Sequence, residues 1–160
     1  MSELRVGLGV DLHRFVDGPA ADQPLVLGGV TFPDERGLVG HSDADAVAHA
    51  VTDAVLGAAG LGDMGTHFPD TDPAWRGADS LELLSAAVAA ASSAGWRFVN
   101  ADCTLVAERP HVAEAAAEMV RRLSAAAGGP VHVKATRPEG LGSLGRVEGV
   151  ACLAVALLAR

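Results

Sequence analysis

The sequence predicts an α+β fold: a single domain over residues 1–160, with a mixed β-sheet and helices packed on one face. The predicted elements follow the order β-β-α-α-β-α-β-β, which suits this arrangement better than a doubly wound parallel sheet. With 160 residues, the chain is long enough to bury about two-thirds of its unfolded surface. Because 49% of the residues are hydrophobic but only 4% are aromatic, we expect a core of Ala, Val and Leu.

Apolar periodicity and turn residues delimit each predicted element. In chain order, the elements are a strand over 4–11, a strand over 25–32 in a hairpin with the first, a helix over 42–59 ended by Gly60, a helix over 79–94, a strand over 96–107, a helix over 110–126, a strand over 131–136 and a strand over 148–159. Between the first two helices, residues 61–73 contain two prolines, two glycines and three aspartates. This composition predicts an irregular loop that is a candidate lid.

Charge and composition exclude several classes of partner. The formal charge of −8 makes the chain a poor general binder of nucleic acid, although a metal could still hold a small phosphorylated ligand. No apolar run is long enough to cross a bilayer, and the N-terminus lacks the pattern of a secretion signal. Cys103 and Cys152 form no CxxC motif and lie in apolar runs, so we expect buried thiols in a reducing cytoplasm. An extracellular disulfide is the alternative.

Residues 40–49 carry the first chemical signal, with two histidines and two carboxylates at the start of the first helix. Ser42 is predicted to cap this helix, because its hydroxyl can accept a hydrogen bond from a backbone N–H two or three residues on. His49 lies four residues after Asp45 and four before Asp53, so the three side chains share one helix face. Taken alone, the stripe is better explained as a solvated helix face.

A metal centre is indicated when this stripe is combined with the end of the first strand. Side chains two residues apart in a strand leave the same face, so Asp11 and His13 would join His49 as one carboxylate and two imidazoles. Three protein ligands and an open fourth position are typical of catalytic zinc, whereas magnesium prefers oxygen ligands. Asp45 and Asp53 are candidates to bind the non-ligating nitrogen of His49. The alternative is an ordinary strand-end pair, since the sequence alone does not bring the segments together.

Two further clusters suit phosphate groups. Free N–H groups at the helix start, beside His41 and Ser42, are typical of a phosphate site, although capping alone would account for Ser42. Asp43 complements the helix dipole. The second cluster places two cations, a hydroxyl and a carboxylate just after a strand, at Lys134, Thr136, Arg137 and Glu139. Glu139 could serve a magnesium ion that bridges phosphates, and the alternative is a charged hairpin turn.

Six segments in one order carry a family resemblance. They are GLGVDLH at 7–13, GHSDAD at 40–45, HAVTDA at 49–54, LGDMG at 61–65, FPDTDP at 68–73 and GRVEG at 145–149. On these motifs, which span nearly the whole chain, it resembles the 2-C-methyl-D-erythritol 2,4-cyclodiphosphate synthase family of the non-mevalonate isoprenoid pathway.

The resemblance implies a phosphorus–oxygen lyase acting on 4-diphosphocytidyl-2-C-methyl-D-erythritol 2-phosphate. The 2-phosphate attacks the β-phosphorus, CMP leaves and a cyclic diphosphate closes, with no protein nucleophile. The resemblance implies a homotrimer with active sites between subunits. It also implies zinc or a similar divalent ion at Asp11, His13 and His49, and Mg²⁺ or Mn²⁺ at Glu139 with the substrate phosphates.

The resemblance further implies roles for individual residues. His41, Arg137 and Glu139 are the predicted catalytic residues. Residues 63–65 would grip the erythritol hydroxyls beneath a covering loop at 68–72. The cytidine would lie on residues 107–113. The predicted substrate-binding set is Asp11, Leu12, His13, His41, Ser42, Asp63, Met64, Gly65, Phe68, Pro69, Asp70, Thr71, Asp72, Ala107, Pro110, His111, Thr136, Arg137, Glu139, Ser143 and Arg146; of these, Arg146, with Glu148, would lie near the trimer axis.

The chain departs from the family pattern at the second phosphate cluster. Where the family usually has Thr-Thr-Thr-Glu, residues 136–139 are Thr-Arg-Pro-Glu, so the threonine thought to steady the transition state is Arg137. An arginine also binds phosphate, and we expect an altered contact. His111 replaces a usual lysine and Ser143 a common phenylalanine. A zinc-dependent phosphohydrolase and a non-catalytic trimer that binds metal or nucleotide are the alternative functions.

Overall fold

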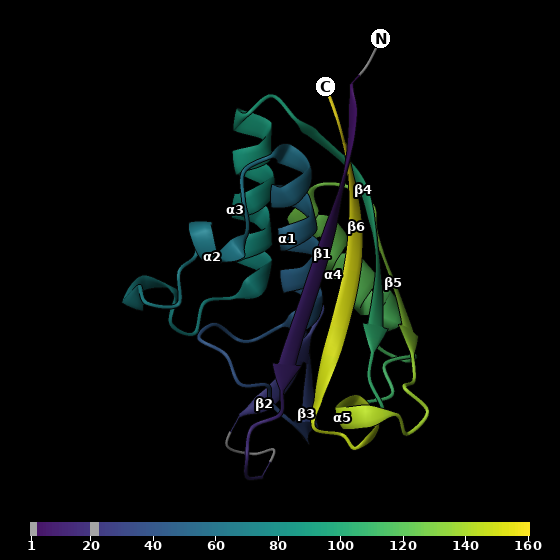
Figure 1. Ribbon diagram of the computed structural model, residues 1–160. Helices are drawn as coiled ribbons and strands as arrows, with labels where there is room; N and C mark the ends of the chain where they lie inside the picture. Colours follow the sequence, from purple (N-terminus) through teal and green to yellow (C-terminus); the bar gives the residue numbers. More distant parts are fainter. Residues whose placement is uncertain (1–2, 20–22) are drawn as a thin grey trace.

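The computed structural model describes residues 3–19 and 23–160, so part of the predicted loop at 17–23 lies outside the described residues. A four-stranded sheet forms the centre of the fold, in the order β1 (Leu4–Arg14), β6 (Gly149–Ala159), β4 (Arg97–Val106) and β5 (Val131–Thr136). Strands β1 and β4 run antiparallel to β6, whereas β4 and β5 are parallel (Figure 1). The predicted mixed sheet is confirmed.

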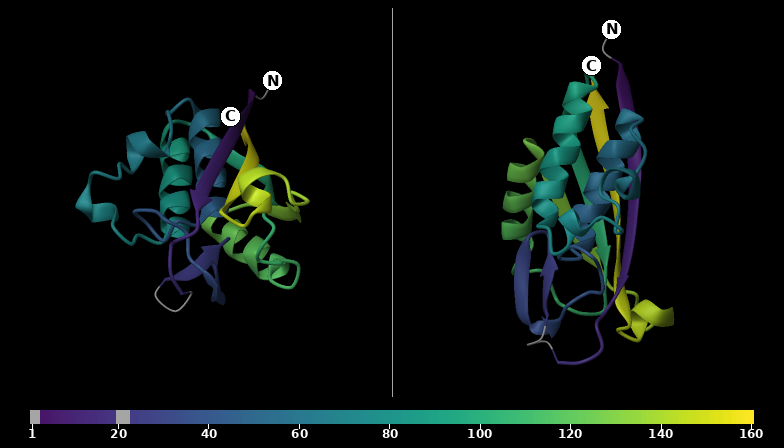
Figure 2. Two further views of the ribbon diagram at one scale, coloured as in Figure 1. Left: turned by 60° about the horizontal axis from the view of Figure 1, so that its bottom comes forward. Right: turned by 90° about the vertical axis from the view of Figure 1, so that its left-hand side faces the viewer.

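Three helices cover one face of this sheet: α1 (Ala46–Ala59), α3 (Ser80–Ser93) and α4 (Ala116–Ala127) (Figure 2). Helix α1 packs on β1 and β6, α4 packs on β5, and α3 lies against α1 and α4. Helix α1 has apolar residues almost all round, and a helix of this kind is stable only when it is buried. The α+β arrangement with helices on one face is confirmed.

Two glycines of β1 allow α1 to approach very closely. A Cβ atom on Gly9 would lie 1.9 Å from the carbonyl oxygen of Ala50, and one on Gly7 would lie 1.9 Å from that of Ala54. Both neighbours are backbone atoms, so no side-chain movement could relieve the clash. The glycines therefore set the distance between β1 and α1, the two elements that carry the predicted metal ligands.

The opposite face of the sheet is apolar and exposed along β1 and β6. Because side chains alternate between the faces of a strand, every second residue of β1 points away from the helices. Large apolar side chains that are at least 42% exposed gather on this face: Leu4, Val6, Leu8, Val10, Leu12, Leu153 and Val155. A surface of this kind is typical of an interface with another chain.

The predicted strand over residues 25–32 is wrong. It is a hairpin of its own, in which β2 (Pro24–Leu27) pairs with β3 (Val30–Arg36) and neither pairs with β1. Gly28 and Gly29 form the turn with positive φ angles of 57° and 74°, a conformation that favours glycine. The partner of β1 is instead the last strand, β6.

The first helix begins at Ala46, four residues later than predicted, because Asp45 and not Ser42 is its N-cap. The carboxylate of Asp45 accepts hydrogen bonds from the backbone N–H groups of residues 47 and 48, and also from those of residues 28 and 29 in the hairpin turn. Asp45 therefore caps α1 and ties the hairpin to it. Gly60 ends α1 in the left-handed conformation, as predicted.

The helix predicted from residue 110 begins only at Ala116; residues 107–115 follow an irregular path with a cis peptide bond before Pro110. Three short turns complete the structure: α2 (Met64–His67), a 3₁₀ turn (Pro73–Trp75) and α5 (Gly142–Gly145). Cys103 and Cys152 are free and buried, as expected. Within the described ranges, no helix combines the length and apolarity needed to cross a membrane.

Candidate metal centre and active site

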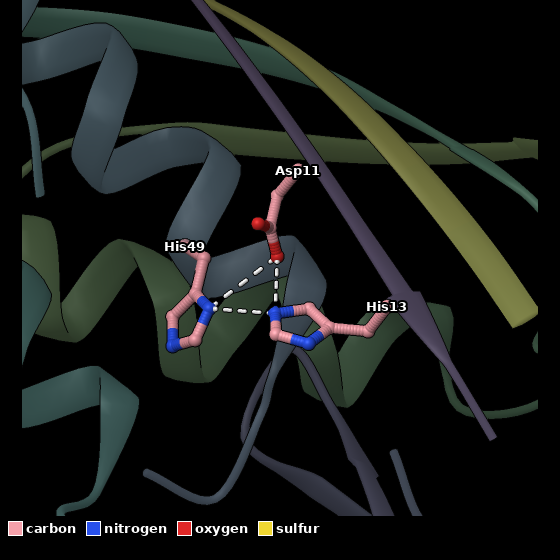
Figure 3. Close-up of side chains that lie close together, drawn as sticks. All are labelled: Asp11, His13 and His49. Atoms are coloured by element: carbon pink, nitrogen blue, oxygen red, sulfur yellow. Dashed lines mark hydrogen bonds and ion pairs between the residues drawn. The ribbon is translucent and has the colours of Figure 1, made fainter. Parts of the chain in front are cut away.

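The three predicted metal ligands come together at one point (Figure 3). Asp11 and His13 project from β1, and His49 projects from the first turn of α1. Asp11 Oδ2 lies 2.9 Å from His13 Nε2 and 3.3 Å from His49 Nδ1, and the two nitrogens are 3.3 Å apart. The strand periodicity and the close approach of α1 thus place one carboxylate and two imidazoles where they could hold a metal ion.

The hydrogen bond of His13 to the backbone leaves Nε2, the ring nitrogen that faces Asp11, as an acceptor. His13 Nδ1 lies 2.7 Å from the carbonyl oxygen of Val39, which can only accept, so Nδ1 carries the proton and Nε2 presents a lone pair. Asp11 Oδ2 is buried and finds no hydrogen-bond donor among the described residues. An unpartnered carboxylate oxygen facing imidazole nitrogens is costly without a cation, and this donor set fits zinc or a similar divalent ion.

Electrostatics at the centre favour positive charge. Burial opposes ionisation of Asp11, but the adjacent imidazoles of His13 and His49 outweigh it and lower the pKa of Asp11 to about 2. Burial likewise opposes charging of His13, but its contacts with Asp11 prevail and raise the pKa of His13. In the metal-free protein, a proton on His13 supplies part of the positive charge that a metal ion would bring.

The partners predicted for the non-ligating nitrogen of His49, Nε2, are wrong. Asp45 is occupied by the backbone N–H groups it caps, and Asp53 accepts a hydrogen bond from Met64 N at 3.1 Å. Instead, His49 Nε2 lies 2.8 Å from Ser80 Oγ and 3.1 Å from Ser42 Oγ. The sequence could not place Ser80 here, because it lies 31 residues away on a different helix.

A cavity of about 300 Å³ lies over the metal centre. Besides the three ligands, its walls come from the predicted phosphate segment and the predicted lid, together with α3: Gly40, His41, Ser42, Met64, Phe68, Asp70, Trp75 and Leu83. Phe68 packs edge-to-face on Trp75, with ring centroids 5.1 Å apart. His41 Nε2 lies 3.1 Å from the carbonyl oxygen of Asp72, so the lid contacts the segment before α1. Trp75 is not among the predicted site residues, because no sequence motif pointed to it.

Within the predicted lid, the aspartates serve local structure. Asp63 caps α2 by accepting hydrogen bonds from the backbone N–H and the hydroxyl of Thr66, both at 2.8 Å. Asp72 caps the 3₁₀ turn by accepting from Ala74 N at 2.9 Å. Gly65, Pro69 and Thr71 do not line the cavity, so their predicted contacts with substrate stay predictions.

The predicted cytidine segment and the second phosphate cluster meet in another cavity of about 250 Å³. It lies between α4 and β5, with walls from both segments: Ala107, Pro110, His111, Val112, Ala113, Ala116, Val133, Lys134, Ala135, Thr136 and Arg137. Glu139 follows in the left-handed conformation, with φ of 53°, and is not among these residues. The structure therefore brings the segment for which the resemblance implies cytidine binding next to the second predicted phosphate cluster.

Arg137 forms an ion pair at the edge of this cavity. Its Nε donates to Glu108 Oε1 at 2.9 Å, and its terminal nitrogen contacts the same oxygen. The backbone N–H of Gly140 donates to Glu108 Oε2 at 3.2 Å. The hydrogen bonds from Arg137 and Gly140 lower the pKa of Glu108. Glu108 is not among the predicted site residues, because its ion pair with Arg137, 29 residues away, is evident only in the fold.

The remaining predicted positions lie near the end of β1. Ser143 lines a cavity of about 280 Å³ together with Leu12 and His13. Arg146 forms an ion pair with Glu148, with Nε and Oε1 2.6 Å apart. Ser143 therefore lies near the β1 edge of the sheet, as the metal centre does, whereas Arg137 lies at the β5 edge.

A carboxylate and two imidazoles at the wall of a cavity, held on an α+β scaffold, are typical of metal-binding enzymes. Comparison with known proteins narrows this class. The YgbB family model matches residues 4–159. A 2-C-methyl-D-erythritol 2,4-cyclodiphosphate synthase of Bordetella petrii is 57% identical over 159 residues, which are 98% of this chain and 96% of the relative.

Solved structures of similar fold come from the same group of synthases. The bifunctional IspDF of Campylobacter jejuni superposes with a TM-score of 0.92 at 38% identity, over 99% of this chain and 43% of that one. The CDP complex of Plasmodium falciparum IspF has a TM-score of 0.81 at 28% identity, over 97% of this chain and 95% of that one. The chain belongs to the YgbB family, and it is an enzyme.

Proposed function

We propose that the chain converts 4-diphosphocytidyl-2-C-methyl-D-erythritol 2-phosphate to 2-C-methyl-D-erythritol 2,4-cyclodiphosphate and CMP, as a phosphorus–oxygen lyase. The observation that carries the proposal is the convergence of Asp11, His13 and His49 at the wall of a cavity on the scaffold of this family. The names of its relatives, which are cyclodiphosphate synthases, support the substrate.

The reaction is an intramolecular exchange at phosphorus. An oxygen of the 2-phosphate bonds to the β-phosphorus, the bond from that phosphorus to the bridging oxygen breaks, and CMP leaves with the electron pair. Since the nucleophile and the leaving group both belong to the substrate, the protein supplies positioning and electrostatic stabilisation. When bound, zinc at the first centre, and Mg²⁺ or Mn²⁺ at Glu139, would supply the positive charge that aligns the phosphates.

Several of the residues proposed to contact the substrate line the two cavities described above. Around the metal centre, His41 and Ser42 would contact the β-phosphate, while Met64, Phe68 and Asp70 would enclose the erythritol. At the other cavity, backbone groups of residues 107–113 would hold the cytidine, and Thr136 and Arg137 would meet its phosphates. The catalytic roles of His41, Arg137 and Glu139 are part of this proposal, as are the contacts of Asp63, Gly65, Pro69, Thr71, Asp72, Ser143 and Arg146.

The arrangement of these cavities supports a homotrimer with active sites between subunits. The metal centre adjoins β1 and the nucleotide cavity adjoins β5, and these strands are the two edges of the sheet. One substrate could contact both only if a neighbouring chain brought its β5 edge to the β1 edge. The exposed apolar face of β1 and β6 offers the surface for this association. The buried free thiols favour a reducing cytoplasm as its location.

Incubation of the purified protein with the substrate, zinc and magnesium tests the proposal. We expect release of CMP and a product with the mass of the cyclic diphosphate, and we expect His49→Ala to abolish both. A product heavier by one water would identify a phosphohydrolase instead. Tight CDP binding without turnover at any metal concentration would identify a non-catalytic binding protein, and either result would overturn the proposal.

A further inference from the structure

Nε2 of His49, the nitrogen that faces away from Asp11 and His13, is hydrogen-bonded to polar side chains that are not predicted metal ligands. Ser80, the first residue of α3, is fully buried, and its Oγ lies 2.8 Å from His49 Nε2. The same hydroxyl contacts the carboxylate oxygen Oδ1 of Asp43. Asp43, Ser80 and His49 thus form a continuous chain that ends at the metal-facing Nδ1 of His49.

The donors and acceptors in this chain permit one direction of hydrogen bonding. The Asp43 carboxylate already accepts hydrogen bonds from the backbone N–H groups of Asp45 and Ser80, both at 3.1 Å, so it is an acceptor for the Ser80 hydroxyl as well. A hydroxyl has one proton, and after donating it to Asp43, Ser80 Oγ can only accept from His49. His49 Nε2 must therefore carry the proton, which leaves a lone pair on Nδ1.

We propose that Ser80 and Asp43 are positioning residues of the metal centre, because they hold His49 in the tautomer and orientation that aim Nδ1 at Asp11 and His13. Outer partners of metal-bound histidines commonly act in this way. In this chain, the usual carboxylate acts through a serine hydroxyl. The inference rests on the proposed function only in that it takes Asp11, His13 and His49 to bind a metal ion.

Ser42 is the competing partner of His49. Its Oγ lies 3.1 Å from Nε2 and accepts a hydrogen bond from Ala44 N at 3.2 Å. Ser42 is only half-buried and lines the cavity, whereas Ser80 is closer, fully buried and tied to a carboxylate. We therefore assign the positioning role to Ser80.

The positioning role of the Ser80 side chain can be tested separately from the packing of α3, because backbone hydrogen bonds also hold α3 in place. The backbone of Ser80 also donates to Asp43, and the backbone of Asp43 donates to the carbonyl oxygen of Ala78 at 3.1 Å. These bonds join α3 to the segment before α1 without the hydroxyl. Ser80→Ala should therefore remove the two contacts of the hydroxyl, to His49 and to Asp43, and leave the backbone bonds of this junction in place.

The test compares zinc affinity in Ser80→Ala, Ser42→Ala and the wild type, measured by competition with a chromogenic chelator. The matched control is Ser85→Ala, in the same helix, whose hydroxyl binds the carbonyl oxygen of Ala126 far from the centre. We expect Ser80→Ala to weaken zinc binding about 10- to 100-fold, with the metal-free protein still folded and still unfolding cooperatively. Ser85→Ala should bind zinc as the wild type does. Wild-type affinity in Ser80→Ala, or a larger loss in Ser42→Ala, would overturn the assignment.

A second measurement needs no variant and no metal. Nitrogen-15 correlation spectra of the histidine rings in the metal-free wild-type protein distinguish the two tautomers, and we expect His49 to carry its proton on Nε2. A proton mainly on Nδ1 would contradict the inference. If wild-type protein with the Nε2 tautomer binds zinc but does not release CMP, the proposed reaction fails while the inference stands.

Discussion

The contact between β1 and α1 at Gly9 makes a quantitative prediction about the metal centre. A Cβ atom at this position would lie 1.9 Å from Ala50 O and 2.7 Å from Ala54 N, whereas ordinary contacts begin at 3.4 Å. Gly9→Ala therefore requires α1 to move away from β1 by about 1.5 Å, the difference between 3.4 and 1.9 Å. Overpacking of this kind costs about 1–3 kcal/mol in the free energy of unfolding.

The same displacement reaches the metal ligands directly. Ala50 adjoins His49 in α1, and Gly9 lies two residues before Asp11 in β1. Metal–ligand distances tolerate only about 0.2 Å of error, and a misplacement of about 1 Å in an active site can cost 100-fold. We therefore expect Gly9→Ala to weaken zinc binding by about 100-fold or more.

Urea denaturation of the metal-free protein and chelator competition measure the two effects separately. The matched control is Gly57→Ala. Gly57 also lies in the contact pair's helix, α1, but a Cβ atom added there meets nothing within 4 Å. Replacing glycine in a helix stabilises it by about 0.5–1 kcal/mol, and zinc binding should not change. Zinc affinity within about threefold of the wild type in Gly9→Ala would refute the reasoning that β1 and α1 set the ligand geometry.

Three further predictions concern the cap, the ion pair and pH. Asp45→Ala should lower the free energy of unfolding by about 2–4 kcal/mol in urea denaturation, because it removes a helix cap and the acceptor for the hairpin turn; a loss below about 1 kcal/mol would contradict this. Glu108→Gln should tighten CDP binding about fivefold in calorimetry, because Arg137 then keeps its charge without a neutralising partner. The gain should be smaller at high salt. Weaker binding would contradict this and would mean that Glu108 holds Arg137 in place. In the metal-free protein, the Asp11–His13 contact should stabilise the fold most between pH 3.8 and 6.5. This contribution is lost as the pH falls toward the lowered pKa of Asp11, near 2, or rises through the raised pKa of His13, and unfolding curves for wild type and Asp11→Asn across pH should converge in both directions.

The ligand set was predictable because it follows from local geometry and short motifs. Strand periodicity places Asp11 and His13 on one face, and the motif at 49–54 supplies His49. The outer partner of His49 was not predictable, since Ser80 comes from another helix and is positioned only by tertiary packing. Helical spacing suggested Asp45 instead, but a carboxylate at a helix start is drawn to the free N–H groups there.

The fold was predictable in class but not in strand pairing. The strands and main helices follow from apolar periodicity, whereas the pairing of β1 with β6 joins the two ends of the chain and leaves no local signal. The hairpin over residues 24–36 did have one, because two glycines between apolar runs are typical of a tight turn. The apolar residues on both sides of these glycines nevertheless suggested one continuous strand over residues 25–32.

A crystal structure of the zinc-loaded protein, with anomalous scattering recorded at the zinc edge, tests the central claim most directly. We predict one ion bonded to Asp11 Oδ2, His13 Nε2 and His49 Nδ1 at about 2.0–2.2 Å, with its open position toward the cavity at a boundary between subunits. An ion at another site, or one bound through His49 Nε2, would contradict the account.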